Sequence, residues 1–439
     1  MLKILLLIIL IAEGYLCFRI LKDKSVSFIL AISLTAVVIL WYLVPGFIVL
    51  VYPFEKIANP LFFIEQNDFV ISYFLESMGL IAALTIFMAI VARRNNSKLV
   101  NIRSNKIINR NIIYLIIIAY IGTIIYRISA MGFNYLDNNA ASLYDEIHQN
   151  TIIILLSQLL FSAMVLFFTL LRRGDWLIYF IYVIVVADSI LRIISGSRIW
   201  FIAPIIIFAF RYLHRTGLTK RAFMLSTITL VLIIYIVLPL SYAIQETRYK
   251  ENSGVLSIIN DFSFHATSST YIKMIFNKFD SFSAGFALIK NAGGFGSAGL
   301  MPFYGSALVF IPRTIWPERP VAGSADGTIY GHPSRLVPSS IMPFSDSLNM
   351  GVAPLHISLW QLGILGAGLF VVGVAAFLFI INNLLLSQRL VRRTAGIYLL
   401  SIPSFHQIIT SLDVIIRQLV IVLFFLVLIE LLQAVLTNR

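Results

Sequence analysis

The stretch 187–204, ADSILRIISGSRIWFIAP, places one acid and two arginines within otherwise apolar sequence. Asp188 and Arg192 are four residues apart, a spacing that puts both side chains on one face of a helix. Arg198 follows in the turn SGSR. An arginine fork can bind two phosphate oxygens at once, and it stays charged at any working pH. These residues therefore predict an anionic ligand that carries phosphate.

The composition places these charges in a membrane protein. The chain has 439 residues, of which 59% are hydrophobic and 12% are charged, whereas a soluble domain has about 25% charged residues. A helix needs about 20 apolar residues to cross the bilayer. Counting such runs predicts an all-α polytopic fold with about eleven spans, near 1–20, 26–51, 69–92, 112–130, 150–171, 176–194, 199–213, 222–243, 356–381, 395–412 and 415–436.

The loops predict the orientation of these spans. Short cytoplasmic loops are rich in Lys and Arg, and four loops have this character: 93–110, 172–175, 211–221 and 387–393. The alternate loops 52–68 and 131–149 are acidic or mixed. We therefore expect the N-terminus outside and the C-terminus in the cytoplasm. The basic loop 93–110 is better explained by this rule than by nucleic-acid binding.

This topology predicts three parts: transmembrane helices in 1–243, a large outer loop in 244–355 with short helices near 255–290, and transmembrane helices in 356–439. A charged group inside a membrane is costly unless it is paired or hydrated, so each one is a candidate for function. The predicted outer half carries seven arginines: Arg192, Arg198, Arg248, Arg313, Arg319, Arg335 and Arg417. Together they favour a membrane-anchored anion, such as a lipid-linked phosphate. Contacts with ordinary phospholipid headgroups are the alternative.

Several catalytic signatures are absent from the sequence. There is no P-loop for ATP, no His-Glu-x-x-His and no paired-cysteine metal motif. The early outer loops contain no Asp-x-Asp, which many membrane glycosyltransferases use to hold a divalent metal. The only cysteine is Cys17. We therefore expect neither a metal nor another cofactor.

Four segments resemble the O-antigen and exopolysaccharide repeat-unit polymerases of the Wzy type. SGSRIW (195–200) resembles their Gly-Ser-Arg turn, and ETRYK (246–250) resembles the arginine that opens their large loop. IPRTIWPERP (311–320) is similar to their Pro-Arg-x-x-Trp-Pro segment. LHISLWQLGILGAG (355–368) resembles the start of the span after that loop. In the family this span often opens with an acidic residue, whereas here His356 lies nearby.

The resemblance implies a glycosyltransferase of the GT-C type in the bacterial inner membrane. Such an enzyme transfers a growing glycan from undecaprenyl diphosphate to an incoming lipid-linked oligosaccharide, sometimes with a chain-length regulator as partner. Negative charge then grows on the diphosphate, and preorganised arginines lower the barrier. The implied diphosphate ligands are Arg198, Arg248 and Arg313, supported by Arg319 and Arg192. The candidates for the general base are His356, ranked first, with Glu246, His265, Asp326, His332 and Asp346.

Two other functions fit the same topology. An O-antigen ligase uses the same lipid carrier, but ligases resemble one another in a His-Asn or His-Ser pair eleven residues before a Gly-x-x-Gly. Here that position, counted from Gly363, is Val352, which favours the polymerase. A flippase or transporter for the lipid-linked unit would make no bonds, and it predicts internal repeats and broken helices. No repeat is present, although prolines interrupt several predicted spans.

Overall fold

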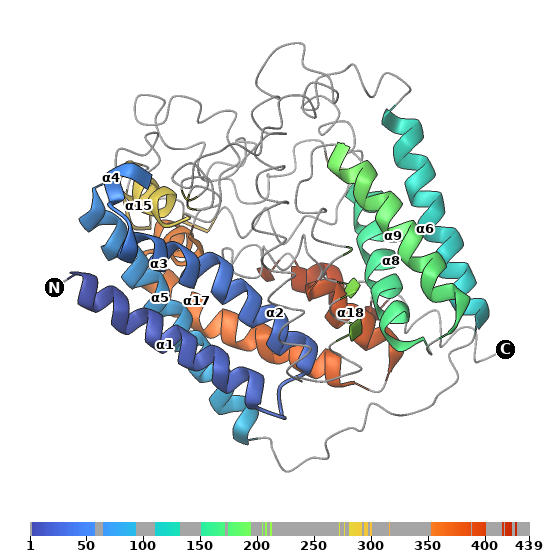
Figure 1. Cartoon of the computed structure of the whole chain (residues 1–439), viewed down its shortest axis with the longest axis horizontal. Coiled ribbons are helices and arrows are strands. Elements are labelled where there is room, and N and C mark those ends of the chain that lie inside the picture. Colours follow the sequence, from blue (N-terminus) through green and yellow to red (C-terminus); the bar gives the residue numbers. More distant parts are fainter. Residues whose placement is uncertain are drawn as a thin grey trace. The chain divides into compact units, whose positions relative to one another are not determined.

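A computed structural model gives the three-dimensional structure of the chain (Figure 1). It describes the following residues: 2–57, 65–93, 110–131, 151–171, 174–194, 204, 207–208, 211–212, 272, 276, 281–291, 294–296, 299–300, 316, 353–387, 389–400, 415–416, 418–423 and 426–427. Nearly all of these residues are helical, as the apolar runs predict. The contacts divide the chain into two compact units, which are residues 1–100, 276–392 and 404–439 in one and residues 101–275 and 393–403 in the other.

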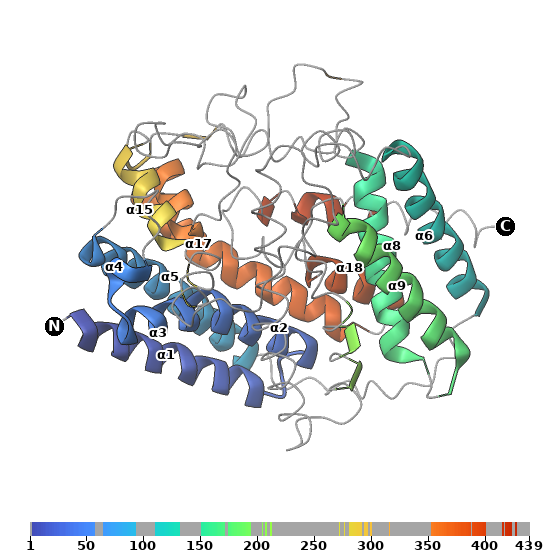
Figure 2. The same ribbon diagram turned by 45° about the horizontal axis from the view of Figure 1, so that its top comes forward.

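The first unit contains helices from both ends of the chain. They are α1 (Leu2–Lys22), α2 (Phe28–Val38), the π-helix η1 (Ile39–Leu43), α3 (Val44–Val51), α4 (Phe54–Ile57), α5 (Gln66–Arg93), α15 (Phe282–Asn291) and α17 (Pro354–Leu386). Helix α5 packs against α1, α15 and α17, and α1 also packs against α2. Figure 2 shows α15 beside the beginning of α17. Helices that are more than 250 residues apart in the sequence therefore share one core.

Helices α2, η1 and α3 form one continuous run from Phe28 to Val51. In the π turn the Val44 N–H donates to the Ile39 carbonyl, five residues earlier. Pro45 follows directly and has no N–H to give, so the helical ladder is disturbed at this point. The carbonyl oxygen of Tyr42, in the same π turn, lies 3.1 Å from the hydroxyl oxygen of Tyr73 on α5.

Helix α17 is broken at Gly363, where φ is 62° and ψ is −145°. Only glycine adopts such a conformation without strain. A Cβ on Gly366 would overlap the Ser358 carbonyl, so this position also requires a glycine. Four residues before the break, the Leu359 carbonyl accepts a hydrogen bond from the Gly296 N–H at 2.9 Å. The Gly-Ile-Leu-Gly segment of the sequence is therefore a helix break.

The far end of α17 is fixed to the turn between α1 and α2. Asn382 accepts a bond from the Ser27 N–H at 2.7 Å, and its own amide donates to the Ser25 carbonyl at 3.1 Å. The break at Gly363 divides α17 into two parts. The part before the break contacts α5 and α15, and the end of the part after it contacts the α1–α2 turn.

The second unit contains α6 (Arg110–Met131), α8 (Thr151–Leu170) and α9 (Trp176–Ile194), together with residues 393–400 of α18 (Leu390–Leu400). Helix α6 packs against α8 and α9, and α8 packs against α9. Aromatic pairs join these helices, for example Phe168 with Tyr182 at a centroid distance of 5.8 Å. Arg211 donates to the Phe168 and Leu171 carbonyls at the end of α8.

The prediction of an all-α membrane protein is confirmed in outline. Within the described residues, five helices are long and apolar enough to cross a membrane: Lys3–Lys22, Phe28–Val51, Gln66–Arg93, Arg110–Ser129 and Pro354–Leu386. Two shorter apolar helices, Leu156–Leu170 and Trp176–Leu191, fall on further predicted spans. Helix α15 overlaps the end of the range where short loop helices were predicted. The remaining predicted spans lie wholly or largely outside the described residues.

Candidate functional site

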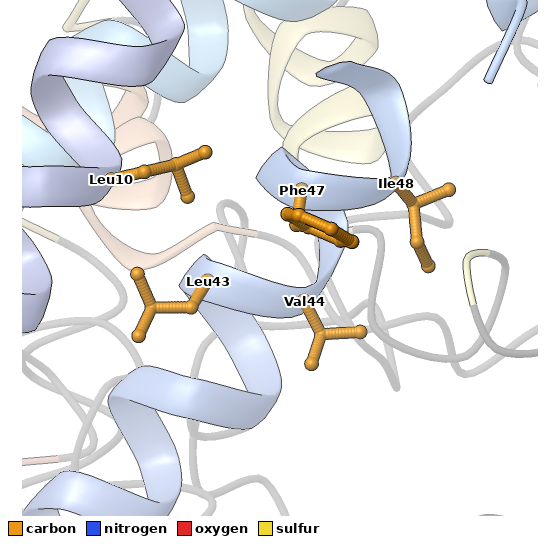
Figure 3. Close-up of a pocket in the computed structure, with 5 residues that line it drawn as sticks. All are labelled: Leu10, Leu43, Val44, Phe47 and Ile48. Carbon is orange, nitrogen blue, oxygen red and sulfur yellow. The ribbon is translucent and has the colours of Figure 1, made fainter. Parts of the chain in front are cut away.

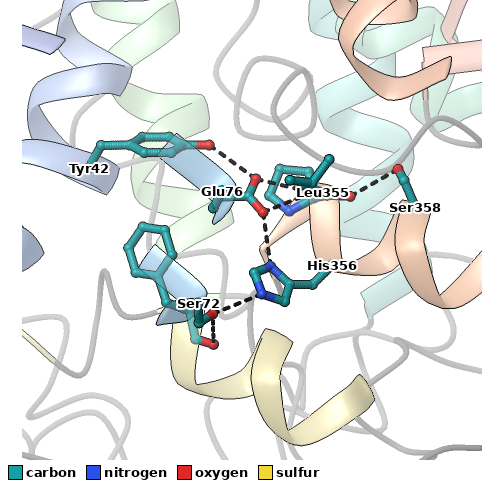
Figure 4. A network of polar contacts seen from close by, with 8 residues as sticks. Tyr42, Ser72, Glu76, Leu355, His356 and Ser358 are labelled. Atoms are coloured by element: carbon teal, nitrogen blue, oxygen red, sulfur yellow. Dashed lines mark hydrogen bonds and ion pairs between the residues drawn. The ribbon is translucent and has the colours of Figure 1, made fainter. Parts of the chain in front are cut away.

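Glu76 of α5 lies at the beginning of α17 (Figure 4). The first helical residues of α17 are Pro354 and Leu355, and the preceding Ala353 has no side chain that could cap the helix. The Leu355 N–H instead donates to both oxygens of Glu76, at 3.1 and 3.0 Å. A carboxylate is favourable at a helix N-terminus because the exposed N–H groups and the helix dipole are both positive there. Glu76 therefore caps a helix that lies 279 residues away in the chain.

His356 lies next to this cap and contacts Glu76 directly. Its Nδ1 is 3.0 Å from Glu76 Oε2, and its Nε2 is 3.0 Å from the Ser72 hydroxyl. Tyr42 donates a further bond to Glu76 Oε1 at 3.3 Å. Glu76 and His356 are both about 1% exposed or less. Four polar side chains from α5, η1 and α17 thus form one buried network.

The donors and acceptors restrict where the protons in this network lie. The Ser72 hydroxyl has one hydrogen, which it donates to the Phe282 carbonyl at 2.8 Å. His356 Nε2 must then carry a hydrogen and donate it to Ser72. One further proton lies between His356 Nδ1 and Glu76 Oε2. The pair is therefore built to hold one proton between an acid and a base, and no ring nitrogen is left over for another ligand.

Helix α15 closes the network on its remaining side. A Cβ on Gly285 would lie 2.8 Å from His356 Cγ, so only glycine lets α15 come this close. The Ala353 N–H donates to the Ser281 carbonyl at 3.0 Å, which ties the residue before α17 to the residue before α15. Both segments belong to the predicted outer loop 244–355, Ser281 within it and Ala353 at its end. The network thus anchors this loop where it rejoins the helical core.

An aromatic layer lies next to the network. The Phe282 ring from α15 packs edge-on against Tyr42 and Tyr73, with centroid distances of 5.7 and 4.9 Å. Phe69 adds a contact with Phe282 at 5.8 Å. Edge-to-face pairs of this kind favour one arrangement of the rings. The layer keeps water away from the polar network and holds α15 against α5.

A second buried carboxyl belongs to Glu13 of α1. The Tyr73 hydroxyl donates to Glu13 Oε2 at 2.9 Å. Gly46 of α3 lies against this tyrosine, because a Cβ there would be 2.6 Å from the Tyr73 hydroxyl oxygen. Helices α1, α3 and α5 therefore meet around a single hydroxyl group.

The second unit has a buried acid–base pair of its own. Asp188 of α9 forms an ion pair with Arg127 of α6, and the Tyr120 hydroxyl donates to the same carboxylate at 2.5 Å. The Arg127 Nε donates to the Thr123 carbonyl at 3.3 Å. The sequence spacing paired Asp188 with Arg192 instead. The backbone of Arg192 lies in α9, but its side chain is outside the described residues.

A groove with a volume of about 310 Å³ lies between α1 and the η1–α3 segment (Figure 3). Its walls are the side chains of Leu10, Leu43, Val44, Phe47 and Ile48. All five are apolar, so the groove offers no group for acid–base or phosphate chemistry. Phe47 is also exposed, as expected for a surface that contacts the hydrocarbon of a bilayer.

Among the residues predicted to act in catalysis or to bind the diphosphate, the structure describes the side chain of His356. Glu246, Asp326, His332, Arg198, Arg248, Arg313 and Arg319 all lie outside the described residues. For these the assigned roles remain predictions. His356 lies at the mouth of α17, as the sequence suggested, but it is buried and its ring is fully engaged.

The partners in these two buried pairs were not predicted from the sequence. Glu76 has no basic residue four positions away in the sequence, and its partner is on another helix. Arg127 was not noted at all, although an arginine inside the predicted span 112–130 is a signal for a buried pair. Tyr42 and Ser72 carry no signal in the sequence, because hydroxyl groups are common in apolar helices.

Comparison with known proteins gives no relationship: no family model, no curated protein and no solved structure matches this chain.

Proposed function

We propose that this chain is a membrane glycosyltransferase that polymerises oligosaccharide repeat units carried on a polyprenyl diphosphate. The observation that carries the proposal is the order of four sequence segments around one large loop: 195–200, 246–250, 311–320 and 355–368. The last of these segments includes the beginning of α17. Its fixation by Glu76 supports the proposal, because a transferase needs a rigid base for the loop that holds its substrates.

In the proposed mechanism, arginines of the outer loop and of the segment 192–198 bind the diphosphate of the donor lipid. Negative charge grows on the leaving diphosphate as the glycosidic bond breaks, and Arg198, Arg248 and Arg313 stabilise it, with Arg192 and Arg319 as supports. The acceptor hydroxyl loses its proton to a base as the new bond forms. Removing one such donor typically costs about 3–4 kcal/mol of transition-state stabilisation.

The geometry favours a positioning role for His356. Its two nitrogens contact Glu76 and Ser72, so it could accept a proton from a substrate only after leaving Ser72. We therefore assign the proton transfer to Glu246, Asp326 or His332 of the loop. His356 and Glu76 keep the end of that loop in place. The eleven-span, N-terminus-outside topology is part of the same proposal, and it places this loop on the outer side of the bacterial inner membrane.

A gene deletion in the native host tests the proposal, with the surface glycan analysed on a gel. We expect the ladder of long chains to disappear while single-repeat material remains. Wild type should restore the ladder, and Arg198→Ala and Arg313→Ala should not. Arg93→Ala is the matched control, since Arg93 is exposed at the end of α5. An unchanged ladder after a confirmed deletion would overturn the assignment.

A flippase or transporter for the same lipid-linked unit is the second candidate, and the break in α17 favours it. Transporters use broken helices to line their binding sites, and α17 breaks at Gly363 within an apolar helix of 33 residues. This candidate predicts a different result in the same experiment. Single repeats would then also vanish from the surface while lipid-linked units accumulate inside. An O-antigen ligase would instead leave polymerised lipid-linked chains.

A further inference from the structure

Among the buried acids that the structure describes in the first unit, Glu13 is the least compensated. It is 1% exposed, and the Tyr73 hydroxyl is its hydrogen-bond donor at 2.9 Å. Its other oxygen, Oε1, has no hydrogen-bond partner. Among the residues that the structure describes, no Lys, Arg or His forms an ion pair with it. A lone carboxylate in an apolar bundle is costly unless something neutralises its charge.

Further buried oxygens without partners lie near this carboxyl. Ser77 of α5 is one turn beyond Tyr73, and its hydroxyl lies near the Glu13 carboxyl but beyond ordinary hydrogen-bond distance. The Thr35 hydroxyl of α2 lies near Cys17, one turn beyond Glu13, and it also has no hydrogen bond of ordinary length. Three helices thus contribute oxygens to one region of the core. Native proteins rarely leave several such groups unsatisfied together.

The chemistry of these groups indicates what could occupy the region. Carboxylate, hydroxyl and carbonyl oxygens are hard ligands that suit hard cations. A single carboxylate balances one positive charge, whereas a divalent ion would remain undercompensated. The Tyr42 carbonyl, 3.1 Å from the Tyr73 hydroxyl, is a further oxygen in contact with the group that bonds to Glu13. A bound water could bridge the hydroxyl groups but would not neutralise the carboxylate.

We propose that Glu13, with Ser77 and Tyr73, forms an intramembrane site for one monovalent cation, either a proton or Na⁺. The cation neutralises Glu13. If the cation is a proton, the protonated carboxyl forms hydrogen bonds with the unpartnered oxygens; if it is Na⁺, these oxygens coordinate the ion. The inference is independent of the polymerase assignment, because it concerns the packing of α1 against α2 and α5. Its consequence is that the stability of this packing depends on the concentration of the cation.

Other titratable groups lie close to Glu13, so an experiment must distinguish their titration from that of Glu13. On the helices that pack against α1 they are Tyr42, Tyr73 and Glu76, and on α1 itself the neighbour is Cys17. The paired His356 lies beyond Glu76. The comparison must therefore be made between variants that differ only at Glu13.

The experiment measures thermal unfolding of the purified full-length protein in detergent micelles. The pH is varied between 5.5 and 8.5, and NaCl is exchanged for choline chloride at constant ionic strength. Glu13→Gln keeps the shape of the side chain and removes its charge. Glu55→Gln is the matched control, because Glu55 is exposed in α4. Ser77→Ala removes one proposed ligand and leaves the carboxyl in place.

We expect wild type and Glu55→Gln to gain several degrees in Tm when the cation is supplied, and Glu13→Gln to show no such gain. A gain on exchange of choline for Na⁺ at fixed pH identifies Na⁺, and Ser77→Ala should reduce it. A gain on acidification alone identifies the proton. The proposal fails if wild type and Glu13→Gln respond in parallel to both variables. It also fails if neither variable changes the Tm of wild type.

Discussion

The two units each bury an acid–base pair between helices that are distant in sequence, but the two bases differ. In the second unit Asp188 pairs with Arg127, whose guanidinium is always charged. In the first unit Glu76 pairs with His356, whose two ring nitrogens contact Glu76 and Ser72. Glu76 also receives two bonds from the Leu355 N–H and one from Tyr42.

The difference between arginine and histidine determines what each pair can do. A permanent pair between α6 and α9 fixes two helices and has no second protonation state near neutral pH. The Glu76–His356 pair shares one proton and caps α17, so it can change its bonding without leaving a charge uncompensated. We therefore regard the Asp188–Arg127 pair as structural and the Glu76–His356 pair as part of the candidate functional site.

The strongest test of the structural pair is Asp188→Asn. This change leaves the Arg127 guanidinium buried without the carboxylate that compensates it, and breaking a buried pair in this way costs about 3–5 kcal/mol. Chemical unfolding of the purified protein measures the loss. Arg127→Gln in the same chain should recover part of it, since both charges are then removed. A double variant no more stable than Asp188→Asn would contradict the pairing.

Glu76→Gln tests the functional pair and should have a smaller effect on stability. An amide keeps the size of the side chain but weakens its bonds with Leu355 and His356. Hydrogen bonds to charged groups contribute about 1.5–3 kcal/mol, and we expect a loss in this range together with loss of glycan polymerisation. Glu65→Gln, at an exposed position before α5, serves as the control. Normal polymerisation by Glu76→Gln would remove the pair from the functional site.

Gly285→Ala tests the packing of α15 on the same pair. The new methyl group would overlap the His356 ring and push it from Ser72 and Glu76. Overpacking of this kind costs about 1–3 kcal/mol. Gly122→Ala in α6 is the matched control, because a methyl group there meets open space. Thermal unfolding should separate the two variants; equal behaviour would mean that α15 does not pack against His356.

Ser72→Ala should have the smallest effect of the series. It removes the hydroxyl group between His356 Nε2 and the Phe282 carbonyl while leaving the cap at Glu76 intact. The loss of stability should be about 0.5–1.5 kcal/mol, as for one ordinary hydrogen bond. Unfolding measurements alongside Glu76→Gln would show the order. A larger loss for Ser72→Ala than for Glu76→Gln would reverse the ranking of the two contacts.

Most of the long helices that the structure describes could be predicted from the sequence alone. Apolar runs of about 20 residues can satisfy their backbone groups in a membrane only as helices or closed barrels. Helices are therefore found where the runs at 1–20, 26–51 and 69–92 predict them. The glycines of the 363–366 segment were also visible as a motif, although not as a helix break.

The partners of the buried charges were decided by the tertiary structure alone. Spacing along one helix suggested Arg192 for Asp188 and offered nothing for Glu76, because such rules count only neighbours on the same helix. The observed bases lie 61 and 280 residues away in the chain. Helix packing brings them together, since each buried charge must find a partner wherever the core supplies one. The sequence by itself determined that these charges are buried in apolar helices, and only the folded structure decided which ones meet.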